Sequence, residues 1–297
     1  MLLLALACSN PRTGDFELEL QRDEGRFSVR HDQRGLILAD LQISAGLGGT
    51  TAEDVDFAFG SFRFPDDDAA MVEGARIAKV REVLDGLALQ IEDRDRQPLG
   101  ELFARAAGDA LLLQWIPVDP DLDRAQLSAA CPSREAFMGL GGQAFDVDHR
   151  GEAFAVWVSE PGIGKVDSEE PPDDWFLTGT RHASSFPMPW LLLPERHLGV
   201  LADTSARVEV DLCSSDERFS LRSWEGSTAW ALITGDEPLD PIRSLAQASG
   251  LPELAPPWVF APWNDAVRGE ERVLEVLDHI LASGAASSVI WTEDWKG

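Results

Sequence analysis

Most of the chain, roughly residues 15–235, alternates apolar and polar residues with a period of two. Residues 16–20 read Phe-Glu-Leu-Glu-Leu, and the runs 208–212 and 219–222 alternate in the same way around a Ser-Ser-Asp turn. Successive side chains of a strand point to opposite faces, so this period is typical of strands buried on one face. Short strands with frequent turn signals favour an antiparallel β-sandwich.

The segment 257–297 has a different pattern. Residues 257–265 predict a short buried strand that ends in polar groups, and residues 269–283 predict a helix with one apolar face that Gly284 stops. Residues 288–291 form a second apolar run. A strand, a helix and a strand in this order predict a βαβ unit with parallel strands. Because a lone βαβ unit cannot bury both faces of its strands, we expect the chain to be the front part of a longer protein.

Residues between these two patterns predict a connection. Residues 240–247 predict a short helix with Asp240 as its cap and proline in its first turn, and Gly250 ends it. The proline-rich residues that follow predict a stiff linker. The expected organisation is a signal remnant over 1–14, a β-sandwich over 15–236, a helix and linker over 237–256, and the start of an α/β barrel over 257–297.

The charge of the chain excludes some partners. Its 297 residues carry a formal charge of −27, from 52 acidic and 25 basic residues spread along the sequence. This charge repels nucleic acids and anionic membrane surfaces, so we expect neither as a partner. At 44% apolar residues the chain can still bury a sizeable core.

The first ten residues are apolar and end near Cys8. The run is too short to span a bilayer, and it resembles the end of a bacterial lipoprotein signal, in which the cysteine is lipidated. We therefore expect an exported periplasmic or outer-membrane lipoprotein that contacts the membrane only through a lipid on Cys8. The alternative is a short buried strand in a cytoplasmic protein. Cys131 and Cys213 lack the spacing of a metal site, and a disulfide between them is allowed after export but not indicated.

Several polar clusters have ordinary structural explanations. The glycine-rich run 139–143 lacks the helix and the Lys-Ser or Lys-Thr pair of a phosphate loop, so a tight turn is predicted. Residues 203–207 fit a structural turn as well as a site. The five histidines are scattered: His279 is expected at the surface of its helix, and His182 and His197 have no identifiable partner. We expect no metal and no cofactor.

The ends of the two predicted parallel strands carry the most suggestive chemistry. Residues 263–265 read Trp-Asn-Asp, and residues 291–295 read Trp-Thr-Glu-Asp-Trp. Amide and carboxylate groups can bind the hydroxyls of a sugar, and an indole can stack on its C–H face. The combination indicates sugar recognition.

The order of motifs over residues 138–297 resembles glycoside hydrolase family 31. The matching motifs are Gly139-Leu140-Gly141, Arg150-Gly151, Trp157 with Glu160, Phe186-Pro187-Met188-Pro189-Trp190, Gly199-Val200-Leu201, Asp203-Thr204-Ser205-Ala206, Leu254-Ala255-Pro256-Pro257-Trp258 and Val289-Ile290-Trp291-Thr292-Glu293-Asp294-Trp295. The resemblance implies a galactose-mutarotase-like sandwich before a (β/α)8 barrel, and a retaining α-glycosidase. Both catalytic carboxylates of that family lie on later barrel strands, so none is expected in this chain, which should hydrolyse nothing alone.

The resemblance also implies residue roles. Glu293 matches an acidic residue that holds a hydroxyl of the non-reducing sugar, Glu160 matches an acidic residue at the pocket rim, and Trp263 and Asn264 match the pocket floor. The expected substrate-binding residues are Glu293, Glu160, Trp263, Asn264, Asp294 and Trp291. The motifs look closest to the sulfoquinovosidase branch, which has glutamine in place of Glu293. Because a carboxylate repels a sulfonate, a neutral α-glucoside or α-xyloside is the expected substrate.

Two alternatives lie outside enzymes. The missing catalytic carboxylates would suit a non-catalytic carbohydrate-binding sandwich. They would also suit a surface lipoprotein whose sandwich binds a partner.

Overall fold

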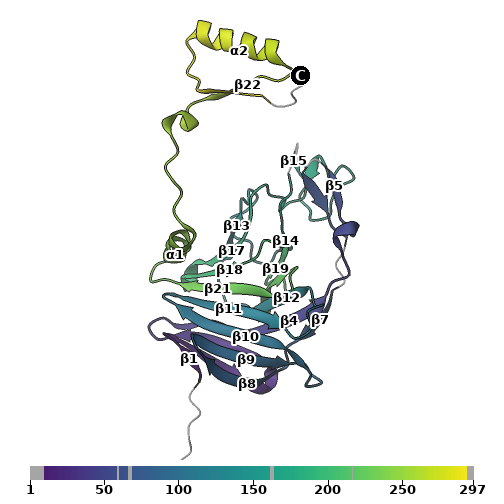
Figure 1. The fold of residues 1–297 in the computed structure, drawn as a ribbon, viewed down its shortest axis with the longest axis vertical. Coiled ribbons are helices and arrows are strands. Elements are labelled where there is room, and N and C mark those ends of the chain that lie inside the picture. Colours follow the sequence, from purple (N-terminus) through teal and green to yellow (C-terminus); the bar gives the residue numbers. More distant parts are fainter. Residues whose placement is uncertain (1–9, 59, 66–68, 161–163, 216, 293–297) are drawn as a thin grey trace, which may run out of the picture. The chain divides into compact units, whose positions relative to one another are not determined.

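Antiparallel strands dominate the structure (Figure 1). The computed structural model describes residues 10–58, 60–65, 69–160, 164–215 and 217–292. The chain divides into a larger unit, Met1–Ala248, and a smaller unit, Ser249–Gly297. The larger unit contains two extended sheets, so the prediction of a mainly β, sandwich-like fold is confirmed.

The first sheet joins nine strands of the described chain in the order β1-β2-β3-β4-β12-β20-β19-β14, with β7 paired to β4. Their bounds are β1 Arg12–Thr13, β2 Phe16–Gln21, β3 Arg26–His31, β4 Gly35–Leu47, β7 Ala70–Glu73, β12 Arg124–Ala130, β14 Ala153–Val156, β19 Val208–Leu212 and β20 Arg218–Ser223. The alternating runs 16–20, 208–212 and 219–222 are confirmed as strands β2, β19 and β20, and β2 pairs antiparallel with β3 and β19 with β20.

The second sheet joins eight described strands in the order β13-β17-β18-β21-β11-β10-β9-β8. Their bounds are β8 Arg76–Val83, β9 Gly86–Glu92, β10 Pro98–Ala107, β11 Ala110–Pro117, β13 Met138–Gly141, β17 Pro187–Leu193, β18 Leu198–Ala202 and β21 Thr228–Thr234. All neighbouring strands in it are antiparallel.

One hydrophobic core unites the two sheets. Phe16 and Phe27 of the first sheet and Trp115 and Trp230 of the second belong to the same buried cluster, and none is more than 1% exposed. Full burial of a large apolar side chain contributes about 1.5–3 kcal/mol. Burial of the apolar residues in the alternating pattern therefore provides the main driving force for this sandwich.

Short elements decorate the larger unit. A small hairpin pairs β5 with β6, and two short strands, β15 and β16, pair in parallel. The bounds are η1 Arg22–Glu24, η2 Ala52–Asp54, β5 Asp56–Ala58, β6 Ser61–Arg63, β15 Gly164–Lys165, β16 Thr178–Gly179, η3 Pro194–Arg196 and α1 Asp240–Ser249. The predicted helix after the sandwich is thus confirmed as α1, and the Asp240 carboxylate accepts backbone N–H groups of Asp236 and Glu237.

The smaller unit contains the predicted βαβ arrangement. Its elements are η4 Pro257–Phe260, β22 Trp263–Asp265, α2 Glu270–Ser283 and β23 Val289–Trp291. β22 and β23 are parallel, and α2 ends at Gly284 in the left-handed conformation, as predicted. His279 is exposed on α2, as expected.

The prediction of a buried strand over residues 257–265 is wrong in its first part, and the three residues that do form a strand are not buried. Residues 257–260 form one 3-10 turn, because proline fixes φ and suits the first position of a helical turn. Only three residues remain extended, and Trp258 and Phe260 are exposed. The continuation of this unit into a barrel stays a prediction.

The glycine-rich run 139–143 is not the predicted tight turn. Met138–Gly141 forms the edge strand β13, which pairs with β17 through a register shift. Leu140 has a φ of 63°, and both flanking glycines also have positive φ. A Cβ on Gly141 would lie 2.1 Å from the Phe186 carbonyl oxygen, so only glycine allows this approach.

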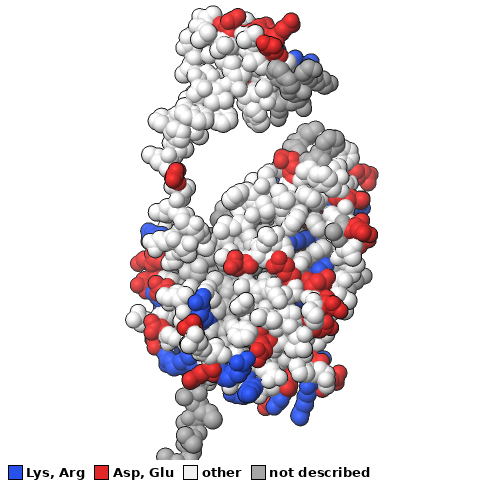
Figure 2. Space-filling model, in the orientation of Figure 1, with Lys and Arg blue, Asp and Glu red and all other residues white. Residues whose placement is uncertain are grey.

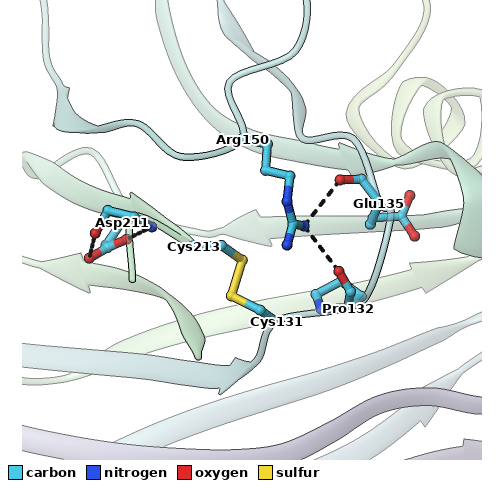
Figure 3. Close-up of a disulfide and its surroundings, with 7 residues drawn as sticks. Cys131, Pro132, Glu135, Arg150, Asp211 and Cys213 are labelled. Atoms are coloured by element: carbon cyan, nitrogen blue, oxygen red, sulfur yellow. Dashed lines mark hydrogen bonds between the residues drawn. A yellow bond between two sulfur atoms is a disulfide. The ribbon is translucent and has the colours of Figure 1, made fainter. Parts of the chain in front are cut away.

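A disulfide joins Cys131 and Cys213 (Figure 3). The cysteines directly follow β12 and β19, which flank β20 in the first sheet, and their Cα atoms are 5.9 Å apart. Arg150 donates hydrogen bonds to the carbonyl oxygens of Pro132 (3.0 Å) and Glu135 (3.3 Å) beside it. The sequence allowed this pairing without indicating it. The cysteines meet because β12 and β19 both pair with β20.

Candidate functional site

Glu160 lies just after β14 on a segment whose backbone is held from two sides. The Glu160 N–H donates to the Gly60 carbonyl oxygen (3.2 Å), and Ser61 Oγ donates to the Glu160 carbonyl oxygen (2.9 Å). On the other side, Ser159 N–H donates to the Ser184 carbonyl (2.9 Å). The Glu160 side chain is exposed, and it makes no ion pair or hydrogen bond with the residues that the structure describes. The arrangement presents a carboxylate from a fixed backbone.

The β5–β6 hairpin that holds Glu160 is anchored by aromatic rings. Phe62 and Phe64 each meet the Trp157 ring edge-on, with centroids 6.0 and 5.9 Å apart. The Arg207 guanidinium lies 4.2 Å from the Phe64 ring and 4.6 Å from the Trp224 ring. We call these five residues the aromatic ladder. The ladder could not be predicted from the sequence, because closely spaced phenylalanines do not reveal that an arginine from far along the chain stacks on them.

The predicted residues of the smaller unit lie on its two parallel strands. Trp263 is 50% exposed and stacks on Trp258, with ring centroids 6.4 Å apart. Trp291 is 54% exposed. Asn264 is partly buried, and its Nδ2 donates to Ser287 Oγ (2.8 Å), which ties β22 to the turn before β23.

The strand register decides which of these side chains share a face. Trp263 is opposite Val289, Asn264 is opposite Ile290, and Asp265 is opposite Trp291. Because side chains alternate along a strand, Trp263 and Trp291 lie on one face and Asn264 lies on the other. The structure therefore brings the two tryptophans to the same side of the small sheet and turns the amide away from them.

Three predicted site residues, Glu293, Asp294 and Cys8, lie outside the described residues. Glu160 belongs to the larger unit, and Trp263, Asn264 and Trp291 belong to the smaller one. Each unit thus offers binding chemistry of its own: a fixed, exposed carboxylate in one and indole faces in the other.

The described residues limit other kinds of site. No group of three His, Cys, Asp or Glu among them is arranged to hold a metal ion, and none of their helices is long and apolar enough to cross a membrane. Figure 2 shows acidic side chains spread over both units in that view. His182, for which the sequence offered no partner, bonds through Nδ1 to Glu169 Oε1 (2.8 Å), so that expectation was wrong.

Comparison with known proteins finds relatives of this chain among enzymes. No family model matches the chain. It is 26% identical over 197 residues to a sulfoquinovosidase of Agrobacterium fabrum, which covers 64% of this chain and 29% of the enzyme. It is 23% identical over 299 residues to a sulfoquinovosidase of Escherichia coli, which covers 97% of this chain and 43% of the enzyme. The chain thus spans less than half the length of either relative.

The fold of the chain is similar to that of a solved structure. The structure of a GH31 family sulfoquinovosidase from E. rectale, in complex with an aza-sugar inhibitor, matches 95% of this chain and 41% of its own, with a TM-score of 0.72 and 20% identity. By sequence and by fold, the chain is therefore related to glycoside hydrolase family 31 over part of the length of those enzymes.

Proposed function

We propose that the chain is the substrate-recognising front part of a retaining α-glycosidase that acts on neutral α-glucoside-like carbohydrates. The observation that carries the proposal is the similarity to a glycosidase along 97% of the chain. In this proposal β22 and β23 are the first strands of a (β/α)8 barrel. Retaining hydrolysis uses one carboxylate as nucleophile and a second carboxyl as acid and then base, and both would come from sequence beyond residue 297.

Within this enzyme, the residues of the chain bind and orient the sugar. Trp263 and Trp291, exposed on one sheet face, offer apolar surface to its C–H face. The Glu160 carboxylate accepts hydrogen bonds from sugar hydroxyls, and the β5–β6 hairpin fixes the backbone that carries it. Glu293 and Asp294 would add carboxylates after β23, and Asn264, on the other face of β22, would support the floor through its hydrogen bond to Ser287.

The direct test is hydrolysis by the full-length gene product. We expect it to release nitrophenol from p-nitrophenyl α-glucoside with retention of anomeric configuration, and the isolated chain to release none. The reading frame downstream of codon 297 should supply barrel strands with two acidic ends. A stop codon there would refute the enzyme and favour a non-catalytic sugar-binding module.

A second candidate substrate is an α-sulfoquinovoside, because the relatives named above are sulfoquinovosidases. A carboxylate at position 293 opposes it, since a sulfonate carries negative charge. In the full-length protein, Glu293→Gln should weaken hydrolysis of the neutral α-glucoside by about 1–3 kcal/mol in transition-state binding, and make the sulfonated substrate relatively better. Rates for both substrates give the preference, and an unchanged ratio would show that Glu293 does not face the distal end of the sugar.

We also propose that the protein is exported and lipidated on Cys8. The Cys131–Cys213 disulfide supports export, because disulfides persist in oxidising compartments. Fractionation of cells that express the protein should place it with membranes, and Cys8→Ala should release it. Recovery of the unmodified protein in the cytoplasm with both thiols free would contradict the proposal.

A further inference from the structure

The outward face of the first sheet forms the floor of a pocket of about 660 Å³. This volume lies within the range of small-molecule sites, about 300–1,000 Å³. We call it the sheet-floor pocket. Its floor residues are Gln126 on β12, Ser220 and Arg222 on β20, and Glu209 and Asp211 on β19. The residues that alternate with them point into the core, so these polar side chains point outward.

Aromatic side chains form much of the wall. The partly buried rings are Phe62, Phe64, Trp157 and Trp175. An outward sheet face is ordinarily polar and open to solvent, but here the β5–β6 hairpin and the 169–183 segment close over it. Polar groups below and ring surface at the sides give the composition that a sugar requires.

Glu209, a charged residue of the pocket floor, is paired with arginines. Glu209 pairs with Arg222 and, at 3.4 Å, with Arg207. Asp211 accepts hydrogen bonds from the N–H and Oγ of Ser214, at 2.9 and 2.8 Å. The Glu209 carboxylate therefore offers no unmatched charge to an added cation. The oxygens and N–H groups of these residues are held in place, however, and can still bind a ligand with many hydroxyls.

Gln126 adds an amide that can serve such a ligand. It lies opposite Arg222 across β12 and β20, so it extends the polar row of the floor. Among the residues that the structure describes, none hydrogen-bonds to its side chain. Its carbonyl and NH2 groups can therefore accept from and donate to adjacent hydroxyls of one sugar ring.

We propose that the sheet-floor pocket binds a neutral saccharide, with an aromatic wall on the C–H face of a sugar ring and the β12–β20–β19 floor on its hydroxyls. This binding goes beyond the proposed hydrolysis, because it needs no catalytic carboxylate and no residue of the smaller unit. The geometry assigns Trp175 to the wall contact and Gln126 to the floor contact.

The test is calorimetric titration of the full chain with isomaltotriose and maltotriose. We expect Trp175→Ala to weaken binding about tenfold and Gln126→Ala about fivefold. Phe186→Ala removes an exposed ring of the same unit outside the pocket and should leave binding unchanged. Thermal unfolding of each variant shows whether the fold is intact, and Gln126→Ala leaves no described partner unsatisfied.

The outcomes separate this inference from the proposed function. Binding that survives both pocket variants, or no binding to the unsubstituted chain, overturns the pocket. Binding that Trp263→Ala abolishes while Trp175→Ala does not also overturns it, and places the saccharide at the strand ends of the proposed glycosidase. Pocket-dependent binding together with a full-length protein that hydrolyses no glycoside supports the pocket and contradicts only the proposed function.

Discussion

His149 and His182 are buried together, with ring centroids 5.6 Å apart, and His182 stacks flat on Phe154. Burial lowers the pKa of His149, and His182 lowers it further. The carboxylates of Asp146, Asp148 and Glu152 act in the opposite direction. The neutral imidazole of His149 is therefore the form that the fold favours.

The lowered pKa of His149 predicts how the stability of the fold changes with pH. Above the unfolded pKa of about 6.5, His149 is neutral in both states and costs nothing. As the pH falls below that value, the unfolded chain binds a proton that the folded chain resists, so stability decreases. We expect His149→Phe to reduce the loss of stability between pH 7.5 and pH 5, measured by urea unfolding. The exposed His279→Phe is the control, and equal slopes in the two variants would contradict the assignment.

The same histidines show what a sequence conceals at this scale. His182 contacts Glu169 because one loop folds back on itself. The two residues are thirteen positions apart, and no helix or strand periodicity in the sequence indicates this contact. The surface position of His279 could be predicted, because a helix has a fixed period and its apolar face was visible.

At the scale of elements, the β5–β6 hairpin is attached to the sandwich through the aromatic ladder. Phe64 is central to it, because it contacts Trp157, Trp224 and Arg207. Phe57 of the same hairpin is 65% exposed and contacts Phe62 at the outer end.

Two phenylalanine substitutions test this attachment. Phe64→Ala removes three ring contacts and a cation–π contact, so we expect it to cost roughly 2–4 kcal/mol in chemical unfolding. Phe57→Ala should cost less than about 1 kcal/mol, because it exposes little new surface. Similar losses in both variants would show that the ladder does not anchor the hairpin.

The predictability of the elements follows from their periods. Strands β2, β19 and β20 could be predicted, because one buried face imposes alternation along each of them. β13 could not, because its glycines and the positive φ of Leu140 resemble a turn in sequence although tertiary pairing with β17 makes a strand. The apolar run 257–263 likewise predicts a longer strand than β22. Two prolines before Trp258 start a 3-10 turn instead, so β22 begins only at Trp263.

At the scale of the whole molecule, the sites depend on contacts distant in sequence. The presence of Trp263 and Trp291 on two paired parallel strands could be predicted from residues 257–291 alone, because they belong to one βαβ unit. The sheet-floor pocket could not, because its rings and its floor come from segments that only the sheet order β12-β20-β19-β14 and the hairpin bring together.

The disulfide should contribute strongly to global stability. Its cysteines are 82 residues apart, and closing a loop of that size in the unfolded chain corresponds to about 4 kcal/mol in the chain-entropy model. We expect the double variant Cys131→Ser/Cys213→Ser to lose roughly this free energy of unfolding, measured by denaturant titration. A reductant should destabilise the unsubstituted protein and leave the variant unaffected, and insensitivity of both would contradict the pairing.

The same bond also closes the chain segment between the two cysteines into a covalent ring. This ring includes the exposed residues 168–171, an accessible target for a protease. A single cut there opens the ring without separating the two fragments. The nicked protein should migrate as one species without reductant and as two with it. A cut in this exterior loop therefore leaves β12 and β19 covalently linked on either side of β20.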